Sequence, residues 1–102
     1  MDKETVIEIL KKYTDIIAGQ FSVKKVILFG SYARGTAKKD SDIDVAVVVD
    51  KMPDDVLAYE SKLYRLRRTL DERIEPVLLE EKEDRSGFLE EILKTGHVIY
   101  SG

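Results

Sequence analysis

The chain has 102 residues, a formal net charge of −3, 43% hydrophobic residues and no cysteine. This length predicts one domain, residues 1–102, and the composition excludes a disordered chain, a disulfide-stapled chain and a thiolate metal site. The acidic balance argues against nucleic acid as a partner, because a dedicated binder needs a broad basic face. The N-terminus lacks a signal-peptide pattern and the longest apolar run is too short to span a bilayer, so we expect a cytoplasmic protein with no membrane partner.

Three elements are predicted in the first half of the chain. Apolar residues spaced three and four apart predict an amphipathic helix over residues 3–18, which ends near Gly19. Two short runs rich in valine and isoleucine, residues 23–29 and 44–49, predict strands, the second of them buried on both faces. The polar stretch between these strands therefore joins two core elements.

The second half of the chain continues the alternation of helix and strand. Asp54 or Asp55 is the candidate N-cap of a helix whose apolar stripe runs to about Glu72. Residues 74–79 predict a third strand, in which Pro76 has no amide hydrogen to donate to a ladder. The proline therefore favours an edge, an end or a bulge of the sheet.

The C-terminal segment predicts a loop and a last helix. The acidic residues 80–84 form the loop, residues 86–94 carry an apolar stripe, and Gly96 stops the helix. The tail, residues 97–100, either adds a short strand or packs on the core. The order helix, strand, strand, helix, strand, helix predicts an α+β fold, with a small mixed β-sheet flanked by helices.

Two short motifs flank the polar stretch between the first two strands. Gly30 and Ser31 follow the first strand, and Asp42 and Asp44 open the second after ten intervening residues. Gly30 allows close approach of the backbone to a ligand. Ser31 is expected to start a helical turn, whose free amides and hydroxyl can receive phosphate oxygens. The two aspartates project from one face of an extended strand, while Ile43 points the other way into the core. Two neighbouring carboxylates favour a hard cation, so the two motifs together indicate phosphoryl chemistry.

Positive charge gathers around these motifs in the sequence. Arg34 can grip a phosphate in a bidentate manner, and it or the neighbouring lysines can instead face an acidic partner surface. Taken singly, each of these charges would be a solvated loop residue, and Gly30 with Ser31 would be an ordinary turn. The basic residues of the cluster are Lys24, Lys25, Arg34, Lys38 and Lys39.

Other polar and aromatic residues carry weaker signals. Tyr32 either lines the nucleotide site or packs beneath the loop, and His97 has no second ligand or nucleophile pattern. Arg65, Arg67 and Arg68 lie opposite a leucine stripe and are predicted to be the solvated side of a helix. Three tyrosines on or beside helical stripes are predicted to be core or interface residues: Tyr13, Tyr59 and Tyr64.

The spacing of the two motifs resembles that of the minimal nucleotidyltransferases of the DNA polymerase beta superfamily, whose signature is Gly-Ser, ten residues, then Asp-x-Asp. Gly30, Ser31, Asp42 and Asp44 match that spacing without a gap. Two segments, ARG and SDID, also resemble those of its antitoxin-like members. The resemblance implies the polymerase-beta-like nucleotidyltransferase fold and a metal-dependent transfer of a nucleoside monophosphate, with AMP from ATP as the expected group.

The resemblance also implies roles for the motif residues. Asp42 and Asp44 are expected to be catalytic and to bind Mg²⁺, with two ions in the site. Gly30, Ser31 and Arg34 are expected to bind the nucleotide. Magnesium suits this assignment because it takes oxygen ligands and often only one or two carboxylates, which leaves positions for phosphate oxygens and water.

A third carboxylate is expected on a neighbouring strand, because polymerase-like sites commonly use one as a metal ligand or general base. Glu75, on the predicted third strand, is the best-placed residue for this catalytic and metal-binding role. The family more often has aspartate at this place, and Pro76 directly follows Glu75. Glu80 is the second candidate.

A chain this short has little surface to orient an acceptor, so a partner is implied. Small members of the family pair with an all-helical HEPN toxin, and the resemblance implies an antitoxin that adenylylates a toxin tyrosine. A helix face or an uncovered sheet edge would hold such a partner, and either can also drive self-association into a homo-oligomer. Two alternatives stay open. One is a non-catalytic antitoxin or binding module, and the other is an aminoglycoside-type small-molecule adenylyltransferase that needs a second helical subunit.

Overall fold

The computed structural model describes residues 1–84 and 86–102 of the chain. Helices and strands follow one another largely as the sequence predicts, and the helical turn expected at Ser31 is the short helix α2 (Gly30–Arg34). In this described part, no helix combines the length and the apolar character needed to traverse a bilayer. The elements are α1 (Lys3–Ala18), β1 (Lys25–Phe29), α2 (Gly30–Arg34), β2 (Ile43–Val49), α3 (Val56–Leu66), the 3-10 helix η1 (Arg67–Thr69), β3 (Ile74–Glu80), α4 (Phe88–Thr95) and β4 (His97–Ser101).

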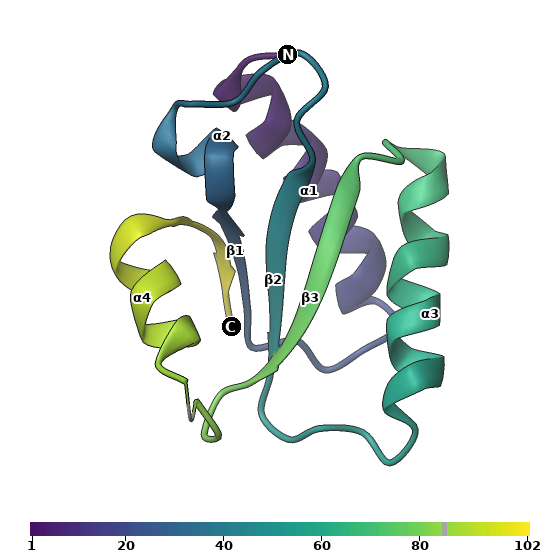
Figure 1. Cartoon of the computed structure of the whole chain (residues 1–102). Helices are drawn as coiled ribbons and strands as arrows, with labels where there is room; N and C mark the ends of the chain where they lie inside the picture. The colour runs from purple at the N-terminus through teal and green to yellow at the C-terminus, as the bar shows by residue number, and fades with distance from the viewer. Residues whose placement is uncertain (85) are drawn as a thin grey trace.

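The strands of the described residues form a four-stranded mixed sheet in the order β3-β2-β1-β4. Strand β2 pairs with β3 in parallel, with α3 in the crossover, whereas β1 runs antiparallel to both β2 and β4. Helices α1 and α3 lie on one side of the sheet and α4 lies on the other (Figure 1). The predicted α+β fold with a small mixed sheet is confirmed.

The main core lies between the sheet and helices α1 and α3. Strand alternation sends Ile43, Val45 and Val47 of β2 toward these helices, and all three are fully buried. The buried Tyr13 of α1 ties the two helices together, because its hydroxyl donates to the Leu63 carbonyl of α3 at 2.7 Å. This face of the sheet is closed to solvent along β2.

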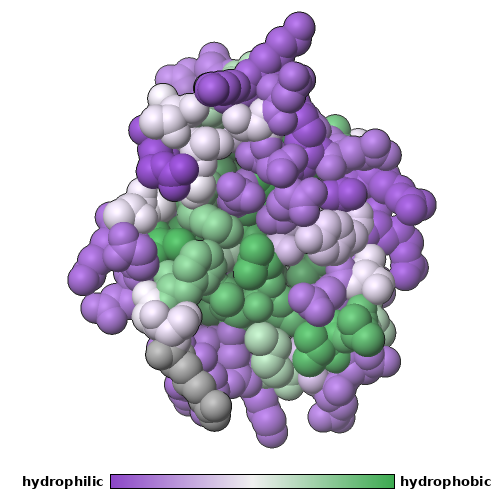
Figure 2. All heavy atoms as spheres, viewed as in Figure 1, coloured by the Kyte–Doolittle hydropathy of each residue, from purple (hydrophilic) through white to green (hydrophobic). Residues whose placement is uncertain are grey.

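The opposite face carries a smaller core under α4. Ala46 and Val48 of β2 are buried here with Leu89 and Ile92 of α4. Helix α4 lies over the β1 side of the sheet, and Figure 2 shows apolar surface in the middle of the remaining face. Because alternate residues of a strand share a face, Asp44 projects on the same side as these β2 residues, onto the partly open face.

The two edge strands of the sheet, β4 and β3, test the predictions made for the tail and for Pro76. The tail forms β4, an antiparallel strand beside β1, so it adds a strand to the sheet. Pro76 lies within β3, and β3 is the other edge strand, which is where a proline is tolerated. The first strand is shorter than the predicted 23–29, although the Lys24 amide still donates to the Val48 carbonyl at 2.8 Å.

Helix α3 is shorter than predicted. Asp55, and not Asp54, is its N-cap, and only the 3-10 helix η1 follows it, so the predicted end near Glu72 is wrong. The physical reason is a competing turn. The Asp71 carboxylate accepts a hydrogen bond from the Arg73 amide at 2.9 Å, which redirects the chain into β3.

Helix α4 begins later than predicted, at Phe88 instead of residue 86. The side chain of Asp84 in the preceding loop accepts hydrogen bonds from the amides of Leu89 and Glu90, at 2.9 Å each. These bonds satisfy donors that a helix start leaves without intrahelical partners, so the aspartate caps the helix from a distance in sequence.

Candidate active site

The two sequence motifs meet where β1 ends and β2 begins. Phe29, the last residue of β1, pairs with Asp44 of β2, and Gly30 follows directly. Gly30 has a φ of 74°, in the left-handed region that favours glycine. A Cβ built on Gly30 would lie 3.0 Å from the Asp44 Cγ and still closer to a carboxylate oxygen. Both the backbone and the neighbouring carboxylate therefore require glycine at this position.

Helix α2 starts beside Asp44 and carries the other predicted nucleotide-binding residues. Its N-cap, Phe29, offers no side-chain acceptor, so the amides of the first turn have no side-chain cap. Ser31 is half-buried in this turn. Arg34 is exposed in the last turn and is close enough to Asp44 to lower the pKa of that carboxyl. The fold therefore gathers Gly30, Ser31 and Arg34 around Asp44.

Negative charge is concentrated at Asp44. Asp42 is exposed immediately before β2, whereas Asp44 is half-buried within the strand. Burial raises the pKa of Asp44, and repulsion from Asp42 and Glu75 raises it further, while Arg34 partly offsets these effects. Asp42 and Glu75 are therefore close enough to Asp44 for their charges to act on its carboxyl.

The sheet register distinguishes between the two candidates for the third carboxylate. Glu75 of β3 pairs directly with Asp44 in the parallel ladder. Glu80 pairs with Val49 at the far end of the same strand, and its carboxylate accepts a hydrogen bond from the Met52 amide at 2.6 Å. The structure therefore places Glu75 beside the motif aspartates and places Glu80 away from them.

The Glu75 carboxylate is bound to side chains that reach it from α3 and η1. The Tyr64 hydroxyl donates a hydrogen bond to Glu75 Oε2 at 3.1 Å. Arg67 Nη1 donates one to Glu75 Oε1 at 3.4 Å. Arg67 also donates to the Ile74 carbonyl at 2.7 Å, and its guanidinium lies 4.8 Å from the centroid of the Tyr64 ring. Among residues 1–84 and 86–102, no three acidic or histidine side chains converge into a metal-binding group.

Tyr64 and Arg67 are therefore residues that the sequence reasoning missed. Arg67 was predicted to be only a solvated helix residue, yet it is half-buried against β3. No local pattern links these residues to Glu75. A helix that crosses over to a parallel strand brings its side chains close to that strand, so the order of elements was the one available signal.

The basic cluster is smaller in space than in sequence. Lys24 precedes β1 and Lys25 begins it, so both lie at the opposite end of the strand from Gly30. The Lys25 Nζ lies 3.8 Å from a carboxylate oxygen of Glu81. The prediction that these two lysines surround the site is wrong, because an extended strand separates its ends. Lys38 and Lys39 are exposed in the loop that leads to Asp42.

The remaining aromatic and histidine predictions are resolved by burial. Tyr32 is 3% exposed and belongs to the main core, so it packs beneath the loop and does not line a surface site. Tyr13 is a core residue, and Tyr59 packs against that core with its ring 4.0 Å from the Phe21 ring. His97 is exposed in β4.

The family of the chain follows from its sequence match. Residues 4–102 match the family model described as polymerase beta, nucleotidyltransferase. The chain belongs to this nucleotidyltransferase family. The family resemblance predicted from the Gly-Ser and Asp-x-Asp motifs is confirmed. The match covers nearly all of this chain.

Three relatives of this nucleotidyltransferase show how far the similarity extends. Protein adenylyltransferase MntA of Thermococcus cleftensis is 31% identical over 97 residues, which cover 95% of this chain and 93% of that relative. A Methanocaldococcus jannaschii protein whose name proposes the same activity is 35% identical over 97 residues, with coverage of 89% and 95%. Another protein of that organism with such a name is 48% identical over 44 residues, and this match spans 43% of the chain and 44% of the relative.

Solved structures share the fold of the nucleotidyltransferase. A crystal structure of a proposed Sulfolobus solfataricus nucleotidyltransferase has a TM-score of 0.70 at 20% identity, covering 97% of this chain and 83% of that one. A toxin-antitoxin structure with AMP-PNP has a TM-score of 0.62 at 21% identity, and the match covers 100% of this chain and 75% of that one. A structure of tri-AMPylated Shewanella oneidensis HEPN toxin with MNT antitoxin has a TM-score of 0.61 at 18% identity, covering 98% and 73%. At these identities the likeness concerns the fold alone, and it confirms the predicted nucleotidyltransferase fold.

Proposed function

We propose that this chain transfers AMP from ATP to a hydroxyl group on a partner protein. The acceptor oxygen forms a bond to the α-phosphorus, the bond from that phosphorus to the bridging oxygen breaks, and pyrophosphate leaves. The hydroxyl proton passes to a carboxylate of the site. The observation that carries the proposal is the strand register. Asp44 pairs with Phe29, the neighbour of Gly30, on one side and with Glu75 on the other.

The carboxylates of this site fit a divalent cation. Burial and the neighbouring Asp42 and Glu75 raise the pKa of Asp44, so its ionised carboxylate is disfavoured in the absence of a cation and would gain from binding one. In our proposal Asp42 and Asp44 hold Mg²⁺, with two ions, and Glu75 is the third ligand or the general base. Bound metal supplies neutralisation of the charge that develops on phosphate oxygens. Tyr64 and Arg67 occupy one acceptor position on each Glu75 oxygen, which leaves further lone pairs for this role.

The nucleotide is held on the α2 side in this proposal. The uncapped amides of α2 and the Ser31 hydroxyl bind phosphate oxygens, and Gly30 lets the backbone approach them. Arg34, near Asp44, adds a charge-assisted hydrogen bond to the triphosphate. These contacts orient the α-phosphorus toward the carboxylates, which is the main task in phosphoryl chemistry.

The identity of the partner is supported by the relatives and complexes. MntA of T. cleftensis is named a protein adenylyltransferase, and the fold of this chain is shared with an antitoxin solved with an AMPylated HEPN toxin. The toxin-antitoxin structure with AMP-PNP supports ATP as the donor. We therefore propose that residues 1–102 act as one catalytic antitoxin domain and that a tyrosine of a HEPN-type helical toxin accepts the AMP.

The experiment incubates the protein with ATP, Mg²⁺ and the product of its neighbouring gene, and then measures intact masses by mass spectrometry. We expect the partner to gain the mass of AMP and pyrophosphate to be released. EDTA and the Asp42→Asn, Asp44→Asn variant should each abolish the gain. Asp15→Asn, an exposed substitution on α1, is the matched control and should retain it.

Other outcomes favour the alternatives. If the Asp42→Asn, Asp44→Asn protein binds and fully neutralises the partner, the chain is a binding module that acts by occlusion. AMP transfer to a small hydroxyl compound, with an unchanged partner mass, would instead indicate the small-molecule adenylyltransferase. Neither result is compatible with protein adenylylation as the neutralising event.

A further inference from the structure

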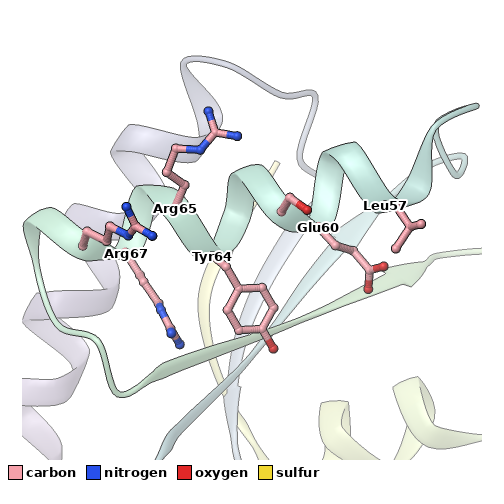
Figure 3. A pocket seen from close by; sticks show the side chains of 7 residues that line it. Leu57, Glu60, Tyr64, Arg65 and Arg67 are labelled. Carbon is pink, nitrogen blue, oxygen red and sulfur yellow. The ribbon is translucent and has the colours of Figure 1, made fainter.

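An open groove runs along the outer side of α3 and η1 and ends close to Glu75. Its lining residues recur three and four apart, so they share one face of the helix. Figure 3 shows Leu57 near one end of this face and Tyr64 reaching from α3 across the neighbouring strand. The groove is lined by Leu57, Glu60, Tyr64, Arg65, Arg67 and Arg68, among others.

The charge of this groove differs in sign from that of the whole chain. Three arginines and one glutamate line it, whereas the chain carries a net charge of −3. Arg65 and Arg68 are exposed, and among residues 1–84 and 86–102 no salt bridge involves either of them. Their guanidinium groups are thus available to a carboxylate ligand, which arginine can bind in a bidentate manner.

The groove is connected to the candidate active site by side-chain contacts of two of its lining residues. Tyr64 and Arg67 both bind the Glu75 carboxylate, and Glu75 pairs with Asp44 across the β2–β3 ladder. A segment that lies in the groove therefore has its end beside the carboxylates. This placement is what an acceptor hydroxyl requires, since AMP transfer depends on orientation of the attacking oxygen.

We propose that the groove docks an acidic, extended segment of the acceptor protein, which delivers its hydroxyl to the Asp44 site. This inference rests on the proposed function, because it names how the acceptor is held. The arginines bind the acidic side chains, and Leu57, 76% exposed at the other end, contacts an apolar residue of the segment. A nucleic acid fits less well, because its phosphates repeat along its whole length and the groove is basic only at the Arg65–Arg68 end.

The test separates docking from catalysis by measuring binding without nucleotide. The probe is a fluorescein-labelled polyglutamate peptide that contains one tyrosine and one leucine, followed by fluorescence anisotropy at low salt. The groove variant is Arg65→Glu, Arg68→Glu. The control is Lys12→Glu, Lys51→Glu, which changes the net charge equally at exposed positions outside the groove. Circular dichroism checks folding, and Arg65→Gln, Arg68→Gln serves if the reversal variant does not fold.

We expect the groove variant to bind the peptide at least about tenfold more weakly than the wild type, and the control to bind within about twofold of it. Equal losses in both variants, or no peptide binding by the wild type, would overturn the proposal. Tighter binding of a single-stranded oligonucleotide through the same arginines would also overturn it, in favour of a nucleic-acid surface.

The partner-mass assay then distinguishes this inference from the proposed function. If the groove variant transfers AMP to the partner as fast as the wild type does, docking in the groove is wrong while the proposed function stands. If peptide binding depends on the arginines but no partner gains AMP, the docking inference stands and the adenylylation is wrong.

Discussion

The two faces of the sheet differ in how completely they are covered. Helices α1 and α3 close one face, where Ile43, Val45 and Val47 are all fully buried. Helix α4 covers the other face only in part, and Asp44 and Glu75 remain half-buried on it. The comparison teaches that the closed face supplies most of the burial that stabilises the fold. The open face can then hold carboxylates that repel one another.

The largest effect is expected from removing charge on the open face. Asp44→Asn should lower AMP transfer by about 10³-fold, or ~4 kcal/mol of transition-state stabilisation, because the proposed metal loses a carboxylate ligand. The same variant should keep or increase the melting temperature in EDTA, since it removes a partly buried charge that Asp42 and Glu75 also repel. Pyrophosphate release and differential scanning fluorimetry measure the two effects. A variant that is active but unfolds early would contradict the division between the faces.

The second prediction compares the loss of stability from an isoleucine-to-alanine substitution in the core on each face of the sheet. Ile17→Ala removes a fully buried side chain from the main core, and Ile92→Ala removes one that is 3% exposed under α4. We expect losses in the free energy of unfolding of about 4 and about 2 kcal/mol, respectively, because α4 can shift over the partly open face and fill part of the cavity. Urea denaturation measures both. Equal losses would show that the α4 face is as tightly constrained as the closed face.

A smaller effect is expected at the glycine that joins the two motifs. Gly30 and Gly35 have nearly equal φ angles, 74° and 76°, but an added Cβ meets Asp44 at Gly30 and meets nothing within 4 Å at Gly35. Gly35→Ala should cost about 1 kcal/mol for the left-handed backbone, and Gly30→Ala about 1–2 kcal/mol more because of the clash. Urea denaturation measures the difference, and only Gly30→Ala should reduce AMP transfer strongly. Matching losses would mean that Asp44 moves freely aside.

The smallest effect is a change of stability with pH. Burial raises the pKa of the Asp44 carboxyl most, Asp42 and Glu75 raise it further, and Arg34 lowers it. Because the pKa is raised in the folded state, ionised Asp44 destabilises the fold. This penalty is absent below the usual value of 3.8 and is complete above the raised pKa. The stability advantage of Asp44→Asn over the wild type, measured in EDTA, should therefore grow as the pH rises from the acid range to neutral. An advantage that shrinks over that range would contradict a raised pKa at Asp44.

Local sequence patterns predicted most of the elements and the two motifs of the candidate site. The period of apolar residues predicts α1, the strands and the existence of α3 and α4, since it reflects which side chains each element buries. Their ends were less predictable. The Asp71 turn after α3 and the Asp84 cap of α4 depend on side-chain hydrogen bonds that compete with helix continuation.

The sequence by itself determined the Gly30-Ser31 and Asp42-x-Asp44 pair, because the two motifs lie at the facing ends of β1 and β2 and are joined by a short stretch of chain. Only the tertiary structure decided what surrounds them. The parallel register of β2 and β3 separates Glu75 from Glu80, and the packing of α3 beside β3 brings Tyr64 and Arg67 to the Glu75 carboxylate. The physical reason is that strand pairing and helix packing bring together residues far apart in the chain, which short-range spacing cannot specify.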